Sequence, residues 1–255
     1  MSKTDEAASV LAALWRSGEQ ATDFPPALKP ASLNDGYDIQ DRFVAALGET
    51  LQGWKLGVGS HKAKRETGIG RAIMGRVLGS RCYRAGETVK LPNLAPITIE
   101  FEIAFVLGRD IHPNEDPGAV MSAVAETKVT FELVRSRFVD RRVIGWPSFA
   151  ADNGGFEALV VGSAVDPAQI GAIASTVVVG VDGVDRVRAL TGEDVTDPYA
   201  AMAGFAALAQ ERGMTLPKGA IISTGTVTQP FNIEGAVAIT ARYLDTEISF
   251  RTDVA

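Results

Sequence analysis

The chain has 255 residues, of which 46% are hydrophobic and 22% are charged, the balance of a globular protein with a buried core. Its formal net charge of -6 argues against nucleic acid or an anionic membrane surface as a partner. A single cysteine, Cys82, excludes an internal disulfide and a cysteine-cluster zinc site, and the two histidines, His61 and His112, lack the spacing of metal ligands. No segment is long and apolar enough for a membrane span, and the N-terminus lacks a signal-peptide pattern, so we expect a cytoplasmic protein.

Apolar residues at helical spacing predict two N-terminal helices, over residues 5–19 and 31–48. Ser32, with Asp35 three residues later, matches the capping box that begins a helix. Two more helices are predicted, over 117–126 and 198–213. The second of these has Asp197 as its N-cap, Pro198 in its first turn and Gly213 just past its end.

Alternating runs of apolar and polar residues predict strands in the rest of the chain, over 98–108, 128–136, 156–163, 175–190, 220–227 and 235–251. Asp182-Gly183, between two valine-rich stretches, predicts a two-residue hairpin turn. We therefore expect one mixed α/β (α+β) domain over residues 1–255. In it, an N-terminal helical layer (1–50) covers a largely antiparallel, rolled or sandwich-like sheet, which forms a β-rich core (51–255).

Three glutamates stand out among the predicted strands. Side-chain alternation places Glu100 and Glu102 together on the face opposite Ile99, Phe101 and Ile103, and it places Glu132 opposite its own apolar neighbours. A hard divalent cation compensates like charges on such a face, and oxygen ligands without histidine or cysteine favour Mg²⁺ or Mn²⁺. A solvent-facing strand with an incidental glutamate pair fits the pattern about as well.

Lys55 is the candidate cation for the same site, because it lies in Gly53-Trp54-Lys55-Leu56-Gly57 among residues that favour burial. One lysine and one divalent ion balance three carboxylates in charge. Taken alone, Lys55 would more readily be interpreted as a surface lysine whose aliphatic stem is buried.

Two further segments are candidates for substrate binding. Ser60 and His61 directly follow the Lys55 segment, and Thr224 lies in Ile222–Thr226, which resembles a strand that ends in a hydroxyl-rich turn. An ordinary strand end explains Thr224 equally well. Residues 57–62 lack both the spacing and the strand-to-helix context of a phosphate-binding loop, so we predict no nucleotide site there.

Several segments in this order resemble the hydratase/decarboxylase family of the fumarylacetoacetate hydrolase superfamily: GWKLGVGS (53–60), MGRVLGS (74–80), IEFEIAFVLGRDI (99–111), FELVRSRF (131–138), ADNGG (151–155) and ISTGTV (222–227). The resemblance spans nearly the whole chain. It implies a fumarylacetoacetate-hydrolase-like fold, a homo-oligomer, Mg²⁺ or Mn²⁺ held by Glu100, Glu102 and Glu132, and Lys55 in the catalytic centre.

The implied reaction is that of a lyase on 2-hydroxydienoates or 2-oxo-enoates in the degradation of aromatic compounds, either a 2-keto-4-pentenoate hydratase or a 4-oxalocrotonate decarboxylase. The metal would chelate the 2-oxo acid and stabilise a dienolate, with Lys55 as proton donor or carboxylate ligand. Two alternatives stay open: an acylpyruvate-type C–C hydrolase, which would need a histidine–glutamate pair where Arg65 precedes Glu66, and a non-catalytic member of the family.

The chain also departs from this family. Ile73 stands where the family's hydratases carry an aspartate, ADNGG replaces ADNAS, and residues 191–198 replace a glycine-rich loop. An apolar side chain cannot exchange a proton, so we expect weak hydration. The decarboxylases of the family resemble the chain better at position 73.

Overall fold

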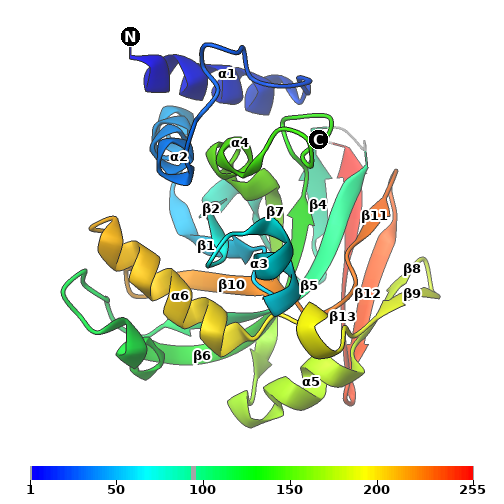
Figure 1. Cartoon of the computed structure of the whole chain (residues 1–255). Coiled ribbons are helices and arrows are strands. Elements are labelled where there is room, and N and C mark those ends of the chain that lie inside the picture. Colours follow the sequence, from blue (N-terminus) through cyan, green and yellow to red (C-terminus); the bar gives the residue numbers. More distant parts are fainter. Residues whose placement is uncertain (1, 93–95, 255) are drawn as a thin grey trace.

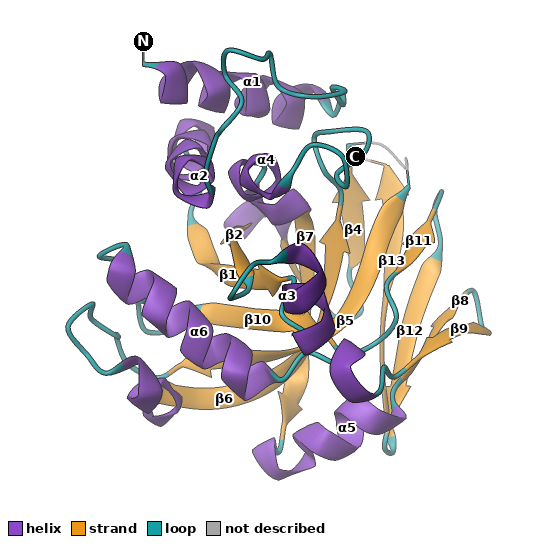
Figure 2. Cartoon of the chain, in the orientation of Figure 1, coloured by secondary structure: helices purple, strands orange, loops and turns teal. Residues whose placement is uncertain are grey.

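A computed structural model describes residues 2–92 and 96–254, and its helices and strands are arranged as in Figures 1 and 2. The α-helices are α1 (Lys3–Ser17), α2 (Leu33–Leu47), α3 (His61–Thr67), α4 (Trp146–Ala151), α5 (Ile170–Thr176) and α6 (Pro198–Glu211). The strands are β1 (Leu51–Gly57), β2 (Ile73–Leu78), β3 (Cys82–Arg84), β4 (Thr88–Leu91), β5 (Ile97–Leu107), β6 (Val124–Val134), β7 (Phe156–Val165), β8 (Val178–Val181), β9 (Val184–Arg188), β10 (Ile221–Thr226), β11 (Phe231–Ile233), β12 (Ala238–Tyr243) and β13 (Thr246–Val254). No helix in this part of the chain has the length and apolar character needed to cross a membrane.

The two N-terminal helices form where the sequence predicts them. Both begin with a capping box, and that of α2 joins Ser32 and Asp35 as expected. Their apolar faces meet at Trp15 and Phe43, whose ring centroids lie 6.2 Å apart. Gln40 of α2 is fully buried and donates hydrogen bonds from Nε2 to backbone oxygens in β2 and α4, which ties the helical layer to the body of the molecule (Figure 1).

The larger sheet has the strand order β2-β1-β10-β5-β6-β7-β3, and β11 adds to one end of β5. The smaller sheet has the order β4-β13-β12-β8-β9. Most pairings are antiparallel; the parallel ones are β1 with β10, β3 with β7 and β4 with β13. The structure thus confirms a mixed fold with a largely antiparallel, curled sheet.

The two sheets pack through an aromatic cluster. Phe101 on β5 lies 5.3 Å from Phe131 on β6, and Phe131 lies 5.1 Å from Phe250 on β13, measured between ring centroids. Tyr243 on β12 completes the cluster at 5.7 Å from Phe101. Since β-strand side chains alternate between faces, the other face of β5 and β6 is left to carry the glutamates.

Other local predictions are confirmed in part. β8 and β9 form the hairpin at Asp182-Gly183, where both residues have positive φ, as the turn requires. α6 begins after Asp197, whose side chain accepts hydrogen bonds from the next turn. The helix predicted over 117–126 is wrong beyond Ala123: a 3-10 helix covers Pro117–Ala123, and Val124 begins β6, because pairing with β5 outweighs the local preference.

The sequence analysis did not predict strands β1 to β4 and β11 or helices α3, α4 and α5, which are rich in glycine or very short. One of them corrects an expectation. β1 is followed within three residues by α3, so residues 57–62 do lie in a strand-to-helix turn. The segment still lacks the spacing of a phosphate-binding loop.

Candidate active site

Three glutamates converge on the large sheet, on the face opposite the aromatic cluster. Glu100 on β5 lies directly across from Glu132 on β6, and Glu102 is two residues further along β5. One carboxylate oxygen from each lies within 4.8 Å of the others. The strand alternation therefore brings the predicted residues together.

Burial makes this cluster electrostatically costly. Glu102 and Glu132 are fully buried, and Glu100 is half-buried. Burial raises the pKa of Glu102 well above its ordinary value, and the charges of Glu132 and Glu100 raise it further. Burial also raises the pKa of Glu132 to about 7, against the opposing effect of Lys55. A cation at this place would favour the ionised carboxylates.

The oxygens of Glu102 are held asymmetrically. Its Oε2 accepts a hydrogen bond from Ser223 Oγ at 2.5 Å and one from the backbone N–H of Gly225 at 3.1 Å. Its Oε1, like Oε2 of Glu132, accepts no hydrogen bond from the described residues although it is buried. Buried carboxylate oxygens without donors, in an all-oxygen set, suit a hard divalent cation. The residues present therefore fit a metal site.

Lys55 completes the cluster from β1. Its Nζ lies 2.7 Å from Glu132 Oε1, and its side chain is 2% exposed. Glycines leave the space that this side chain occupies: a Cβ on Gly154 would lie 3.0 Å from Lys55 Cε, and a Cβ on Gly75 would lie 3.1 Å from it. The buried lysine is thus packed closely and its ammonium group is directed at the glutamates.

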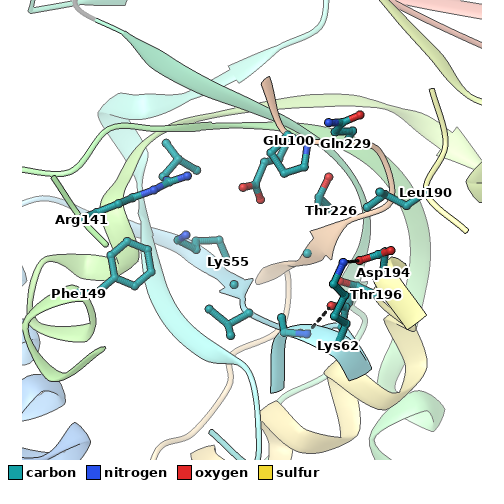
Figure 3. Close-up of a pocket in the computed structure, with 18 of the residues that line it drawn as sticks. Lys55, Lys62, Glu100, Arg141, Phe149, Leu190, Asp194, Thr196, Thr226 and Gln229 are labelled. Atoms are coloured by element: carbon teal, nitrogen blue, oxygen red, sulfur yellow. Dashed lines mark hydrogen bonds and ion pairs between the residues drawn. The ribbon is translucent and has the colours of Figure 1, made fainter. Parts of the chain in front are cut away.

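A cavity of about 650 Å³ opens above this cluster, as Figure 3 shows. Lys55 and Glu100 lie in its wall, together with apolar side chains that include Trp146, Phe149 and Leu190. At one edge, Lys62 of α3 forms an ion pair of 2.9 Å with Asp194. A mostly apolar cavity with a few convergent charges is typical of a small-molecule site.

Of the three predicted substrate-binding residues, Ser60 lines the cavity, whereas His61 and Thr224 do not. Ser60 lines the cavity, and its hydroxyl caps α3 by accepting a hydrogen bond from the backbone N–H of Ala63. His61 is exposed on α3 and is not among the lining residues. Thr224 is fully buried and donates its hydroxyl hydrogen bond to the backbone oxygen of Ile103. Its neighbour Thr226 lines the cavity instead.

Ile73 is 1% exposed, begins β2 and pairs with Gly57 of β1. Its side chain is not among those that line the cavity.

Sequence reasoning missed several lining residues: Val58, Lys62, Arg141, Arg142, Trp146, Phe149, Asp194, Thr196 and Gln229. The adjacent arginines had a visible signal, since they end an arginine-rich stretch, residues 135–142, that follows the glutamate strand. The others lie on helices and loops that local patterning did not place.

Comparisons with known proteins identify the family of this chain. Residues 76–244 match the family model described as Fumarylacetoacetate (FAA) hydrolase C-terminal. A 4-oxalocrotonate decarboxylase from a Pseudomonas species is 24% identical over 215 residues, 82% of each chain. A 2-keto-4-pentenoate hydratase from Paraburkholderia phymatum is 29% identical over 205 residues, covering 80% of this chain and 78% of that one.

A solved structure extends the likeness to the fold. The 4-oxalocrotonate decarboxylase from Pseudomonas putida G7, complexed with magnesium and adipate, superposes with a TM-score of 0.86 at 23% identity and covers 98% of this chain and 97% of that one. The family match spans well over half of the chain and contains the three clustered glutamates. The chain is therefore a member of the fumarylacetoacetate hydrolase family.

Proposed function

We propose that this protein is a divalent-metal-dependent lyase that acts on 2-hydroxydienoates or 2-oxo-enoates, of the hydratase or decarboxylase type, in the degradation of aromatic compounds. The observation that carries the proposal is the meeting of Glu100, Glu102 and Glu132 beside Lys55 at the base of a cavity large enough for a small acid. Relatives named as hydratases and decarboxylases support it.

The three glutamates would hold Mg²⁺ or Mn²⁺. Both ions prefer carboxylate oxygens, and neither histidine nor cysteine lies among the cavity-lining residues of the described chain. When bound, the ion supplies Lewis-acid stabilisation of the negative charge that develops on a 2-oxo acid as it becomes an enolate.

The chain's own residues have distinct tasks. Ser223 and Gly225 fix one oxygen of Glu102, so the other oxygen is presented to the ion. Lys55, held at Glu132, is placed to give a proton to the substrate or to bind its carboxylate. Trp146 and Phe149 line the cavity with apolar surface, which excludes water from the reacting carbons.

A C–C hydrolase finds less support. The corresponding water activation would need a histidine paired with a glutamate. His61 is exposed outside the cavity, and Arg65 of the same helix pairs with Glu193 at 2.9 Å.

Metal-dependent turnover is the test. The purified protein would be assayed by ultraviolet absorbance against 2-hydroxypenta-2,4-dienoate, a 2-oxo-3-hexenedioate and an acylpyruvate, with Mg²⁺, with Mn²⁺ and with a chelator. We expect turnover of at least one of the first two acids, lost with the chelator. Turnover of the acylpyruvate alone, or turnover that survives the chelator, would contradict the proposal.

A further inference from the structure

Two arginines that line the cavity have no ion-pair partner among the described residues, although the charge of Arg141 acts to lower the pKa of the nearby Glu132. Arg141 and Arg142 lie in the loop between β6 and α4, and both line the cavity above the glutamates. Through their side chains, neither makes an ion pair or hydrogen bond with any residue in the described ranges 2–92 and 96–254. Arg141 is half-buried and Arg142 is exposed.

Each of the other charged side chains that line the cavity has an opposite charge to balance it. Lys55 pairs with Glu132, and Lys62 pairs with Asp194. Under the proposed function, a divalent ion balances Glu100 and Glu102. The positive charges of the two arginines therefore remain, in a cavity whose walls are otherwise largely apolar.

The arginines also mark one end of the cavity. They line both this cavity and an adjoining one of about 460 Å³, and Val134 and Pro230 lie at the same boundary. Figure 3 shows Arg141 directing its guanidinium group into the space that Lys55 and Glu100 also face, on the side away from Lys62 and Asp194. An arginine so placed offers a fork of donors that matches a carboxylate.

We propose that Arg141 binds a second carboxylate of the substrate, at the end remote from the 2-oxo acid group, so that the enzyme prefers 2-oxo dicarboxylic acids to monocarboxylic ones. This inference rests on the proposed function, in which the metal takes the 2-oxo acid end. A doubly negative substrate balances the charge that the arginines leave, whereas a monocarboxylate leaves one positive charge uncompensated. Apolar walls at Val134 and Phe149 suit the carbon chain between the two ends.

Binding of two matched acids tests the inference without requiring turnover. 2-Oxoadipate and 2-oxohexanoate have the same number of carbons and differ only in the remote carboxylate. Their affinities would be measured by calorimetry in Mg²⁺. We expect 2-oxoadipate to bind about 10- to 100-fold more tightly, the range of a charge-assisted hydrogen-bonded pair.

Arg141→Gln should bring the ratio of the two affinities close to one by weakening 2-oxoadipate alone. Arg142→Gln removes the same charge from the more exposed neighbour and should lower the ratio less. Arg141→Lys keeps the charge without the fork and should give an intermediate ratio. Thermal unfolding, expected to stay unchanged, and continued binding of Mg²⁺ check that each variant is folded with its metal site intact.

Several results would overturn the inference: a wild-type ratio near one, no binding of either acid, a ratio that survives Arg141→Gln, or a larger loss in Arg142→Gln. Equal weakening of both acids by Arg141→Gln would place Arg141 at the 2-oxo acid end and would also overturn it. Failure of the proposed function would give a different result. Metal-dependent turnover would then be absent, while the preference for binding 2-oxoadipate would persist.

Discussion

Lys55 and Glu132 form an ion pair of 2.7 Å in which the lysine side chain is 2% exposed and the glutamate is fully buried. Such a pair gains little stability over apolar residues of the same volume, because removing both charges from water costs about as much as their attraction returns. Its position next to two further carboxylates, at the base of a cavity, supports the catalytic role proposed for Lys55.

Metal affinity should depend on the hydroxyl that holds Glu102. We expect Ser223→Ala to weaken Mg²⁺ binding about 10- to 100-fold, as loss of a hydrogen bond to a metal ligand does, and Glu102→Gln to weaken it at least as much. Thr224→Val is the matched control, because that hydroxyl bonds to a backbone oxygen. Calorimetric titration measures all three, and equal affinities for wild type and Ser223→Ala would contradict the assignment.

The space around Lys55 should be intolerant of a single methyl group. In Gly154→Ala the new Cβ would lie 3.0 Å from Lys55 Cε and 3.2 Å from Nζ, so the lysine must move. We expect turnover to fall at least about tenfold with metal affinity little changed.

Gly192→Ala is the control for backbone strain. Gly192 has φ +60, almost the same as +59 for Gly154, and nothing lies within 4 Å of its added Cβ. Both variants should lose about 1 to 2 kcal/mol of stability from the left-handed conformation, but only Gly154→Ala should lose turnover. Equal turnover losses would assign the effect to strain.

Stability of the metal-free protein should fall as pH rises, because of Glu132. In the unfolded chain this carboxyl titrates near 4.5, and in the folded protein its pKa is about 7. Between these values the folded protein keeps a proton that the unfolded chain has released. The resulting stabilisation is present below about pH 4.5 and is lost as pH rises through 7.

Urea unfolding at pH 5 and pH 8, in the presence of a chelator, measures this effect. The difference between the two pH values should shrink in Glu132→Gln and persist in Glu126→Gln, which changes an exposed glutamate on the same strand. Adding Mg²⁺ at pH 8 should restore stability to the wild type. The same pH difference in wild type and Glu132→Gln would refute the expectation.

The sequence predicts the glutamate cluster well because strand alternation is local. Glu100, Glu102 and Glu132 lie in long regular strands, where the position of each side chain follows from its neighbours. The strand end at Ser223 to Thr226 is harder. The pairing of β10 with β5 shifts register there and Gly225 has φ +106, so alternation no longer tells which hydroxyl faces the site.

Residues on loops could not be placed from patterning. Arg141 reaches the cavity because the chain turns after β6 and returns through α4, and that path depends on contacts distant in sequence. Buried groups hold the chain on this path; the Arg137 guanidinium, for example, pairs with Asp152 at 2.5 Å. No local pattern reports such a pair.

Self-association is expected from the strand edges and exposed apolar side chains. Val184 is 68% exposed in the β8–β9 hairpin at one edge of the smaller sheet, and Val143 is 71% exposed in the loop that carries Arg141. Uncovered sheet edges and apolar surface favour burial against a second copy. Sedimentation at micromolar concentration should give at least a dimer, and a species of only 26.9 kDa would count against this.

Hydration should be the weaker of the two lyase reactions. Addition of water requires a proton donor or acceptor near the alkene, and Ile73 supplies neither. Among the described residues that line the cavity, the acids are Glu100, assigned to the metal, and Asp194, paired with Lys62. We therefore expect slow metal-dependent hydration of 2-hydroxypenta-2,4-dienoate.

The variant Ile73→Asp tests whether the missing acid at position 73 is the cause of slow hydration. Ile73 does not itself line the cavity, but it pairs with Gly57, which does, and so lies on the face of the β1–β2 pair that carries Lys55. General acid–base assistance contributes about 10²- to 10⁴-fold. Hydration should therefore rise even though burying a carboxylate lowers stability. Ile73→Asn, similar in size and without a titrating group, should not raise it. Fast hydration by the unmodified protein would show that another group, such as Lys55, already supplies the proton.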